Sequence, residues 1–439
     1  MIPQKRLQTL ILIVGDLMLF YISLYFALSL RYQEWVTSGV WRTHQLPFFY
    51  IHMLWLFLFY IAGVYNIKDF ISYKKIAEKM LKTLAVASIL AVFIFYLTPA
   101  VLITPKTNLL IDVSILAILL IGWRRLFWTV SKKITKIKVA FLGGSKEEIK
   151  FANHLTKNPQ LGYEPVENLE NDDLINFIKK NNIQVVIASR DLIQKEEKAK
   201  QLYKILPLGI SVVNFENFYE NLVEKIPVSI INESWFLENL TEINKKSFET
   251  FKRIADILGS IVLGIPTLVA LPFIGLVIKA GSRGPVFYKQ KRVGKNNKIF
   301  EIIKFRTMVK NAEKNGPQWA QEKDSRITWI GKILRKTSVD ELPQLWNVLK
   351  GEISFIGPRP ERPELTEWLE KEIPHYAMRH LAKPGLSGWA QIKYPYGASI
   401  EDAKEKLQYD LYYIKNRSTI LELAIAAKTL FALIARKVH

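Results

Sequence analysis

The chain contains no cysteine and has far fewer acidic than basic residues. The absence of cysteine excludes disulfide bonds, thiolate metal sites and a cysteine nucleophile, and it is typical of a reducing compartment. The 61 lysines and arginines against 40 acids give a formal net charge of +21, which suits nucleic acid, an anionic membrane surface or a phosphorylated substrate. Because 49% of the 439 residues are nevertheless hydrophobic, the composition favours a membrane protein with cytoplasmic faces over a nucleic-acid binder.

Four long apolar runs occupy the first third of the chain, and they predict a transmembrane domain over residues 1–135. A span needs about 20 mostly apolar residues, which the first three runs reach and the fourth approaches. Basic residues gather before the first run, between the second and third, and after the fourth, so both ends of the block are expected in the cytoplasm. The runs are 7–30, 46–65, 83–105 and 107–123. No cleavable signal peptide is expected.

Two acids, Asp16 and Asp112, lie inside the predicted spans. Intramembrane acids are functional candidates by default. Both lie near helix ends or flanks, so we expect structural contacts for them.

Residues 136–240 alternate short apolar runs with polar helical stretches, which predicts a Rossmann-like α/β module. Its expected buried strands are 138–144, 183–189 and 210–215. The first strand is followed by Gly143-Gly144-Ser145 rather than by the complete G-x-G-x-x-G pattern. Without the third glycine a dinucleotide site is not favoured, so we expect a structural or regulatory module with no bound cofactor.

A 25-residue apolar segment, 254–278, is long enough to cross a membrane, yet basic residues flank it on both sides. Because basic flanks favour the cytoplasm, both ends are expected on the same side. Pro266 and Pro272 offer places to break the helix. We therefore predict a re-entrant helix over about 252–280 with its break at Pro266; the alternative is a kinked span. A β-hairpin over 286–308 and mixed helix and loop to residue 439 are expected to follow, including a packed or interfacial helix at 421–435.

The stretch SVDELPQLWNVLKGEISFIGPRP, residues 338–360, holds two adjacent acids, Asp340 and Glu341, at the start of a predicted helix. Ser338 and Glu341 fit a capping box, which would account for Glu341 without any chemistry. The alternative is a carboxylate nucleophile facing a phosphate clamp, because an aspartate can form an acyl-phosphate.

Basic residues within the same hundred positions favour the second interpretation. Lys304 and Arg306 alternate on a predicted strand and are expected to share a face. Arg335 precedes the acids, and Arg359 stands between two prolines on a rigid turn, where its planar guanidinium suits phosphate oxygens. Such groups would offset charge on a transferring phosphoryl group, and magnesium suits a pair of carboxylates combined with substrate phosphates.

Several motifs in collinear order resemble the bacterial sugar transferases, the polyprenyl-phosphate phosphoglycosyl transferases with one membrane-dipping helix. The resemblance covers about residues 247–439, and its motifs are FKRIADILGSIVLGIP, KFRTM, RITWIGKILRKTSVDELPQLWNVLKGE, SFIGPRP, KPGLSGWAQI and YDLYYIKNRS. The four preceding spans and the Rossmann-like module are similar to the large form of that family. The implied fold is a membrane protein of α plus α/β class, with a mixed α/β catalytic domain at 247–439.

The resemblance implies a two-step reaction at the cytoplasmic face of the bacterial inner membrane. Asp340 would attack the β-phosphate of a UDP-sugar and release UMP; undecaprenyl phosphate would then take the sugar-1-phosphate, starting exopolysaccharide, capsule or O-antigen synthesis. Glu341 would help to bind Mg²⁺ with Asp340. Arg335 and Arg359 would hold phosphate, and Lys304 and Arg306 match conserved basic positions. A homo-oligomer, a dimer, is expected, although no sequence pattern shows whether chains pair.

Two other functions stay open at this point. One is a membrane-anchored enzyme that modifies nucleotide sugars in the α/β module, which a full glycine motif would favour and the chain lacks. The other is a non-catalytic scaffold or regulator of polysaccharide assembly, for which an altered acid pair would be the sign. We expect sugar specificity in the loops 309–325 and 394–400, whose sequence does not name the sugar.

Overall fold

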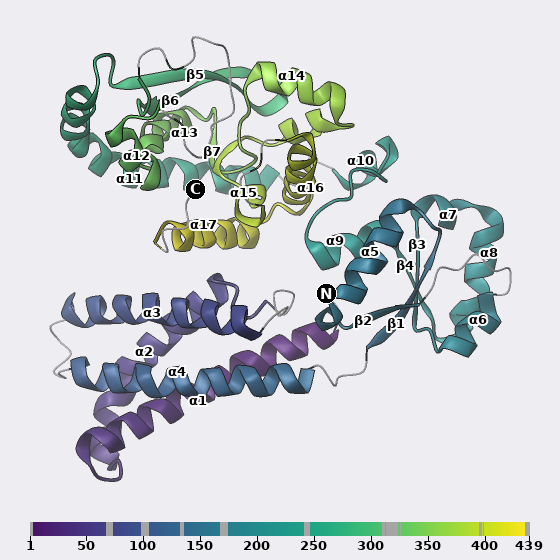
Figure 1. The fold of residues 1–439 in the computed structure, drawn as a ribbon, viewed down its shortest axis with the longest axis horizontal. Helices are drawn as coiled ribbons and strands as arrows, with labels where there is room; N and C mark the ends of the chain where they lie inside the picture. Colours follow the sequence, from purple (N-terminus) through teal and green to yellow (C-terminus); the bar gives the residue numbers. More distant parts are fainter. Residues whose placement is uncertain are drawn as a thin grey trace. The chain divides into compact units, whose positions relative to one another are not determined.

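The protein, seen in a computed structural model (Figure 1), forms two compact units, Met1–Leu222 and Val223–His439. The structure describes residues 3–66, 73–97, 105–131, 136–166, 174–240, 246–309, 312, 324, 326–394, 397 and 399–434. Each unit is considered by itself below.

The four apolar runs of the first unit are largely helical where they are described; residues 98–104, at the end of the third run, lie outside the described residues. They form α1 (Pro3–Tyr32), α2 (Ser38–Ile61), α3 (Tyr73–Leu97) and α4 (Pro105–Ser131). α4 packs against both α1 and α3, and α2 packs against α3. Among the described residues, three helices are long and apolar enough to cross a membrane, namely Leu7–Tyr32, Ser38–Ile61 and Lys246–Gly281. That α3 and α4 also span therefore stays a prediction.

Both acids inside the helical block have partners, as expected. Asp16 accepts two hydrogen bonds from the guanidinium of Arg124, at 2.7 and 2.6 Å, and a third from the Tyr65 hydroxyl at 2.8 Å. Asp112 accepts from Ser23 at 2.6 Å and lies 3.3 Å from the ring of His52. A buried charge without such partners would be strongly unfavourable. These contacts join α1 to α4 and α4 to α2.

The α/β module contains a parallel sheet in the order β2-β1-β3-β4, with strands β1 (Ile137–Leu142), β2 (Tyr163–Val166), β3 (Val185–Ala188) and β4 (Ser211–Asn214). Three strands match the predicted runs, and β2 was missed. β2 is a four-residue edge strand containing Pro165, so it lacks the apolar run that marks a buried parallel strand. The helices are α5 (Lys146–Lys157), α6 (Leu174–Asn181), α7 (Arg190–Gln194), α8 (Glu196–Ile205) and α9 (Phe215–Val223), with 3₁₀ turns η2 (Pro159–Leu161) and η3 (Leu206–Leu208).

The glycine turn of this module is occupied by the protein's own carboxylate. Glu148 Oε2 accepts hydrogen bonds from the backbone N–H groups of Gly144 and Ser145, at 2.9 and 3.0 Å, and Ser145 completes a capping box with Glu148. A Cβ atom on Gly143 would lie 2.3 Å from the same oxygen. The amides at this helix N-terminus, which could otherwise bind an anion, are thus already satisfied.

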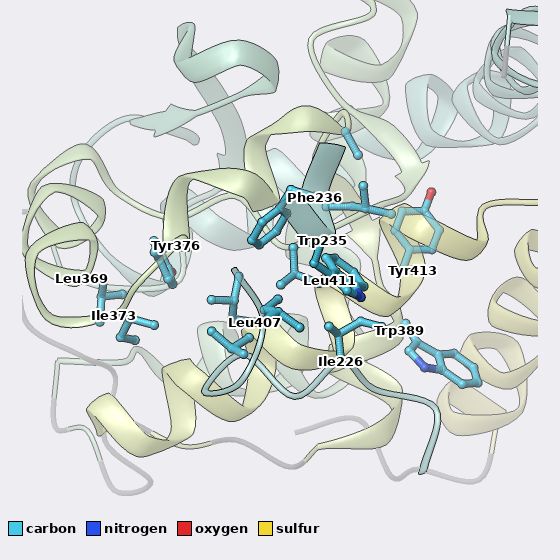
Figure 2. Close-up of a cluster of buried hydrophobic side chains, with 14 of the residues drawn as sticks. Ile226, Trp235, Phe236, Leu369, Ile373, Tyr376, Trp389, Leu407, Leu411 and Tyr413 are labelled. Carbon is cyan, nitrogen blue, oxygen red and sulfur yellow. The ribbon is translucent and has the colours of Figure 1, made fainter. Parts of the chain in front are cut away.

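The predicted boundary of the α/β module at residue 240 is wrong. Figure 2 shows Ile226, Trp235 and Phe236 in one buried cluster with Leu407 and Leu411 of the second unit. The helix α10 (Glu233–Asn239) therefore belongs to the catalytic domain, and the compact units divide after Leu222. The cluster explains why: the tryptophan and phenylalanine of this short helix bury their rings there rather than in the module.

The second unit contains the predicted hairpin, β5 (Phe287–Val293) and β6 (Ile299–Phe305), which run antiparallel side by side (Figure 1). A short parallel pair of strands, β7 (Ser354–Ile356) and β8 (Gly385–Ser387), follows later in the sequence. The helices are α11 (Lys246–Gly281), α12 (Trp329–Lys336), α13 (Leu345–Lys350), α14 (Pro363–Glu372), α15 (Trp389–Lys393), α16 (Ile400–Asn416) and α17 (Thr419–Ile434); the 3₁₀ turns are η5 (Lys295–Asn297), η6 (Val339–Gln344) and η7 (Tyr376–Leu381).

The break at Pro266 stays a prediction: α11 is helical from Lys246 to Gly281, with both Pro266 and Pro272 inside it. A proline removes one hydrogen bond of a helix, and neighbouring turns on either side can still hold it together. The outer side of the helix is apolar, with Val262, Leu268 and Phe273 each more than 60% exposed.

Both ends of α11 nevertheless pack on the same domain. Near its start, Lys252 donates to the Ile356 carbonyl at 2.8 Å, and Asp256 accepts from the Ser354 hydroxyl at 2.9 Å. Near its end, Ile278 is buried against Phe305. A helix crossing the whole bilayer would carry one end away from the domain that holds the other.

We expect the Asp16–Arg124 pair to be essential for the stability of the helical block. Asp16→Asn or Arg124→Gln should cost about 3–5 kcal/mol, because each leaves a buried charge without its partner. The double variant Asp16→Leu/Arg124→Met should be less harmful than either. Thermal unfolding of the detergent-purified full chain measures this, and Glu78→Gln, in the exposed pair with Lys82, is the control. A double variant as unstable as the sum of the singles would contradict the interpretation.

Candidate active site

The two acids lie in the first turn of η6, directly after a residue with unusual backbone geometry. Ser338 has φ 55° and ψ 17°, the left-handed region that serine rarely adopts. Its side chain caps no amide of η6, and the Glu341 N–H bonds to the Ser338 carbonyl instead. The capping-box interpretation of Ser338 and Glu341 is therefore wrong. Strained residues of this kind concentrate at functional sites, and here the strain sets the direction of the following turn.

Glu341 uses its carboxylate to join two distant segments. Oε1 accepts a hydrogen bond from Lys304 of β6 at 2.7 Å, and it accepts from Arg359, after β7, at 3.3 Å. Lys304 and Glu341 are mostly buried, whereas the Arg359 side chain is 47% exposed. The site thus contains an ion triad, Lys304–Glu341–Arg359, of which Arg359 faces solvent.

Asp340 differs from Glu341 in its hydrogen bonding and in the direction of its pKa shift. Its side chain is only 8% exposed, and within the described part of the chain its carboxylate makes no hydrogen bond. Burial, together with the charge of Glu341, raises the pKa of Asp340, against the opposing effect of Lys304, Arg335 and Arg359. A carboxylate stripped of water and of hydrogen-bond donors is a stronger nucleophile than a solvated one.

The same surroundings act in the other direction on Glu341. Burial alone would raise its pKa, but Lys304 and Arg359 outweigh burial and lower the pKa to about 2. Burial lowers the pKa of Lys304, and Glu341 partly restores it. Glu341 consequently stays ionised at any ordinary pH and holds the cations in place. Two neighbouring acids with pKa values pushed apart are a common sign of divided catalytic roles.

The structure brings Arg335 to the site and places Arg306 elsewhere. Arg335 Nε donates to the Thr307 hydroxyl at 2.9 Å, and its charge lowers the pKa of Asp340. Arg306 is buried, and its two terminal nitrogens donate to the carbonyls of Ser282 and Arg283, at 2.7 and 3.1 Å. The prediction that Arg306 shares a phosphate-facing surface with Lys304 is therefore corrected: the chain leaves the strand after Phe305, and Arg306 fixes the end of α11.

The turn that carries Arg359 is held by residues that the sequence analysis missed. Arg379 of η7 donates to the Arg359 carbonyl at 3.1 Å, and Arg292 of β5 donates to the Pro360 carbonyl at 2.9 Å. Asp410 of α16 pairs with Arg379 at 2.8 Å. A signal was present for Asp410, because it lies on the same helical face as Leu407 and Leu411, and an acid on a buried face needs a partner.

The residues that could hold a divalent cation at this site are the two adjacent acids. Among the described residues, no group of three or more histidines, aspartates or glutamates forms a ready-made metal site. The oxygen donors of Asp340 and Glu341 fit Mg²⁺, which commonly takes one or two carboxylates and completes its shell with substrate phosphates and water. The predicted specificity loops lie largely outside the described residues, since 310–311, 313–323, 325, 395–396 and 398 are not described.

The two acids should respond oppositely to neutralisation. Asp340→Asn should leave the thermal stability unchanged or raise it, because a raised pKa means that folding disfavours the ionised form at neutral pH. Glu341→Gln should cost about 1–3 kcal/mol, because Lys304 and Arg359 lose their acceptor. Thermal unfolding of the full chain in detergent measures both, with the exposed acid variant Glu364→Gln as control. The reverse order of stabilities would contradict this division of roles.

The domain that holds this site resembles known proteins. The sequence profile of the bacterial sugar transferase family matches residues 247–436. The chain is 41% identical over 222 residues to an Aeromonas hydrophila protein named UDP-N-acetylgalactosamine-undecaprenyl-phosphate N-acetylgalactosaminephosphotransferase, covering 50% of this chain and 52% of that one. Two proteins named UDP-glucose:undecaprenyl-phosphate glucose-1-phosphate transferase, from Xanthomonas campestris pv. campestris and Klebsiella pneumoniae, are 30% and 33% identical.

The extent of these matches differs. The aligned region spans about half of the Aeromonas relative, but 67% of the Xanthomonas and Klebsiella relatives, and it covers 68% and 67% of this chain. The aligned lengths of 329 and 322 residues exceed the catalytic domain, so the likeness extends into the N-terminal unit. The chain belongs to the bacterial sugar transferase family.

Proposed function

We propose that this protein transfers a sugar-1-phosphate from a UDP-sugar to undecaprenyl phosphate and releases UMP. The observation that carries the proposal is the pair of unlike acids: a buried Asp340 without a hydrogen bond beside a Glu341 fixed by Lys304 and Arg359. The names of the Aeromonas, Xanthomonas and Klebsiella relatives support the donor and acceptor classes. The sugars in those names differ, so the proposal names the class of donor and not the sugar.

In the first step, a carboxylate oxygen of Asp340 attacks the β-phosphorus of the donor. The bond between that phosphorus and the oxygen bridging to the α-phosphate breaks, and UMP leaves with the electron pair. In the second step, a phosphate oxygen of undecaprenyl phosphate attacks the same phosphorus and the aspartyl–phosphate bond breaks, which regenerates Asp340. Arg335 and Arg359 neutralise charge that builds on the phosphoryl oxygens and on the leaving phosphate.

In this scheme Lys304 acts by holding the Glu341 carboxylate in place. Its ammonium lies 2.7 Å from Glu341, so the glutamate can direct Arg359 while it stays ionised. When bound, Mg²⁺ would be held by Asp340 and Glu341 with substrate phosphates, and it would supply further charge neutralisation on the diphosphate.

We place the reaction at the cytoplasmic face of the bacterial inner membrane, with α11 as a re-entrant helix. The donor is water-soluble and the acceptor phosphate lies at the leaflet boundary, so one site must reach both phases. The apolar outer side of α11, with both ends packed on the catalytic domain, supports this arrangement. The product would start exopolysaccharide, capsule or O-antigen synthesis. A homodimer stays part of the proposal.

The alternatives have less support. A scaffold without activity has no need to keep a buried, unpartnered acid, which lowers stability. Modification of a nucleotide sugar in the α/β module is disfavoured because Glu148 occupies the glycine turn where a diphosphate would bind.

The nucleotide product tests the proposal. Detergent-purified protein with Mg²⁺, undecaprenyl phosphate and a panel of UDP-sugars should release UMP from at least one donor. Asp340→Asn should reduce the rate by at least about 10⁴-fold and abolish the labelled phosphosugar–protein adduct, because the attacking oxygen is lost. Glu364→Gln should behave like the wild type. Release of UDP instead of UMP would refute phosphosugar transfer, and turnover by Asp340→Asn would refute the covalent step.

The pH dependence of kcat/KM should reveal Asp340 separately from Glu341. The reaction needs ionised Asp340, whose pKa is raised above 3.8, so activity should fall as the pH drops through that raised value. Glu341, with a pKa of about 2, adds no second acid limb. Arg335→Gln should move the limb to higher pH, since Arg335 lowers the pKa of Asp340. A limb that stays fixed or moves downward would contradict the assignment.

A further inference from the structure

We propose that the buried pair Arg379–Asp410 is a positioning device for Arg359. It fixes the backbone of the Pro358–Arg359–Pro360 turn and so sets the distance between the Arg359 guanidinium and the acids. The inference rests on the proposed function for its kinetic readout. Neither residue touches Asp340 or Glu341 in the hydrogen bonds and ion pairs of the described residues, so both act through Arg359.

The turn depends on its carbonyl groups, because Pro358 and Pro360 have no N–H to donate. Three successive carbonyls have donors from three different segments. Gly385 N–H binds the Pro358 carbonyl at 2.9 Å, Arg379 binds that of Arg359 at 3.1 Å, and Arg292 binds that of Pro360 at 2.9 Å. Arg379 is the donor at the residue whose side chain faces the acids.

Arg379 is itself held through both of its terminal nitrogens. Its side chain is 5% exposed; Nη2 donates to Asp410 Oδ2 at 2.8 Å and Nη1 donates to the Tyr376 hydroxyl at 2.5 Å. The guanidinium carbon also lies 5.0 Å from the centre of the Tyr376 ring. Since Nη2 bonds both Asp410 and the Arg359 carbonyl, Asp410 on α16 helps to fix the middle carbonyl of the turn.

A buried ion pair is a poor way to gain stability, because desolvation offsets most of the attraction. An apolar pair would pack here at lower cost, but it could not hold a carbonyl. Only a planar guanidinium presents several donors in fixed directions, so a lysine at 379 could keep the charge and not the three contacts. The chemistry of the pair thus fits positioning rather than packing.

The contacts form an uninterrupted series from Asp410 to the nucleophile. Asp410 holds Arg379, Arg379 holds the Arg359 backbone, and the Arg359 side chain lies 3.3 Å from Glu341. A displaced Arg359 should therefore slow phosphoryl transfer.

The test uses Arg379→Lys and Asp410→Asn in the full-length protein. Each should lower the rate of UMP release by about 10–100-fold, as expected for a catalytic group displaced by about 1 Å, mainly through kcat. Each should leave the KM for the UDP-sugar nearly unchanged. Arg417→Lys is the matched control, because Arg417 is equally buried and pairs with Glu249 instead of the turn. It should leave both readouts unchanged.

A double-variant cycle separates positioning from a general structural effect. In an Arg359→Ala background, Arg379→Lys should cause no further loss of activity, because the group it positions is absent. Additive losses would overturn the inference, as would an equal effect of Arg417→Lys. If Arg379→Lys does not fold, Asp410→Asn in the same cycle decides. Failure of the wild type to release UMP would refute the proposed function itself. The position of the Arg359 turn in a structure of Arg379→Lys then decides the inference, and an unmoved turn overturns it.

Discussion

The charge balance around Glu341 is the interaction on which the rest of the site depends. One carboxylate compensates a buried lysine from β6 and an arginine from the turn after β7, so three segments far apart in sequence are joined at one point. Removing that charge would leave two cations facing a single buried acid. The compensation keeps Glu341 ionised and holds Lys304 and Arg359 on that glutamate rather than on Asp340, the proposed nucleophile.

Around the ion triad, several charged side chains of the catalytic domain bind backbone groups. Lys252 and Asp256 of α11 bind β7, which leads into the Arg359 turn, and Arg253 donates to the carbonyls of Val348 and Leu349 at the end of α13. Arg306 fixes the far end of α11. The apolar helix that would enter the membrane is therefore also the frame of the active site. Because α11 contacts the segments that carry the site, the site should keep a constant position relative to the membrane surface where the proposed lipid acceptor lies.

The N-terminal unit shows a different use of polar groups. Asp16 and Asp112 are satisfied by partners within the helical block, and Glu148 fills the amide cluster of the glycine turn. In the α/β module, the Glu148 carboxylate of α5 takes the position at the glycine turn that an anion could otherwise occupy.

The sequence by itself determined the four apolar helices, the hairpin at 286–308 and the motifs that contain Asp340, Glu341 and Arg359, because periodicity, turn residues and motif order are local properties. Only the tertiary structure decided the partners. It replaced the capping box of Ser338 by the ion triad, moved Arg306 to the end of α11, and assigned residues 226–236 to the catalytic core. The physical reason is that burial and charge compensation depend on side chains from distant segments. No local pattern records which distant carboxylate or carbonyl a given arginine will meet.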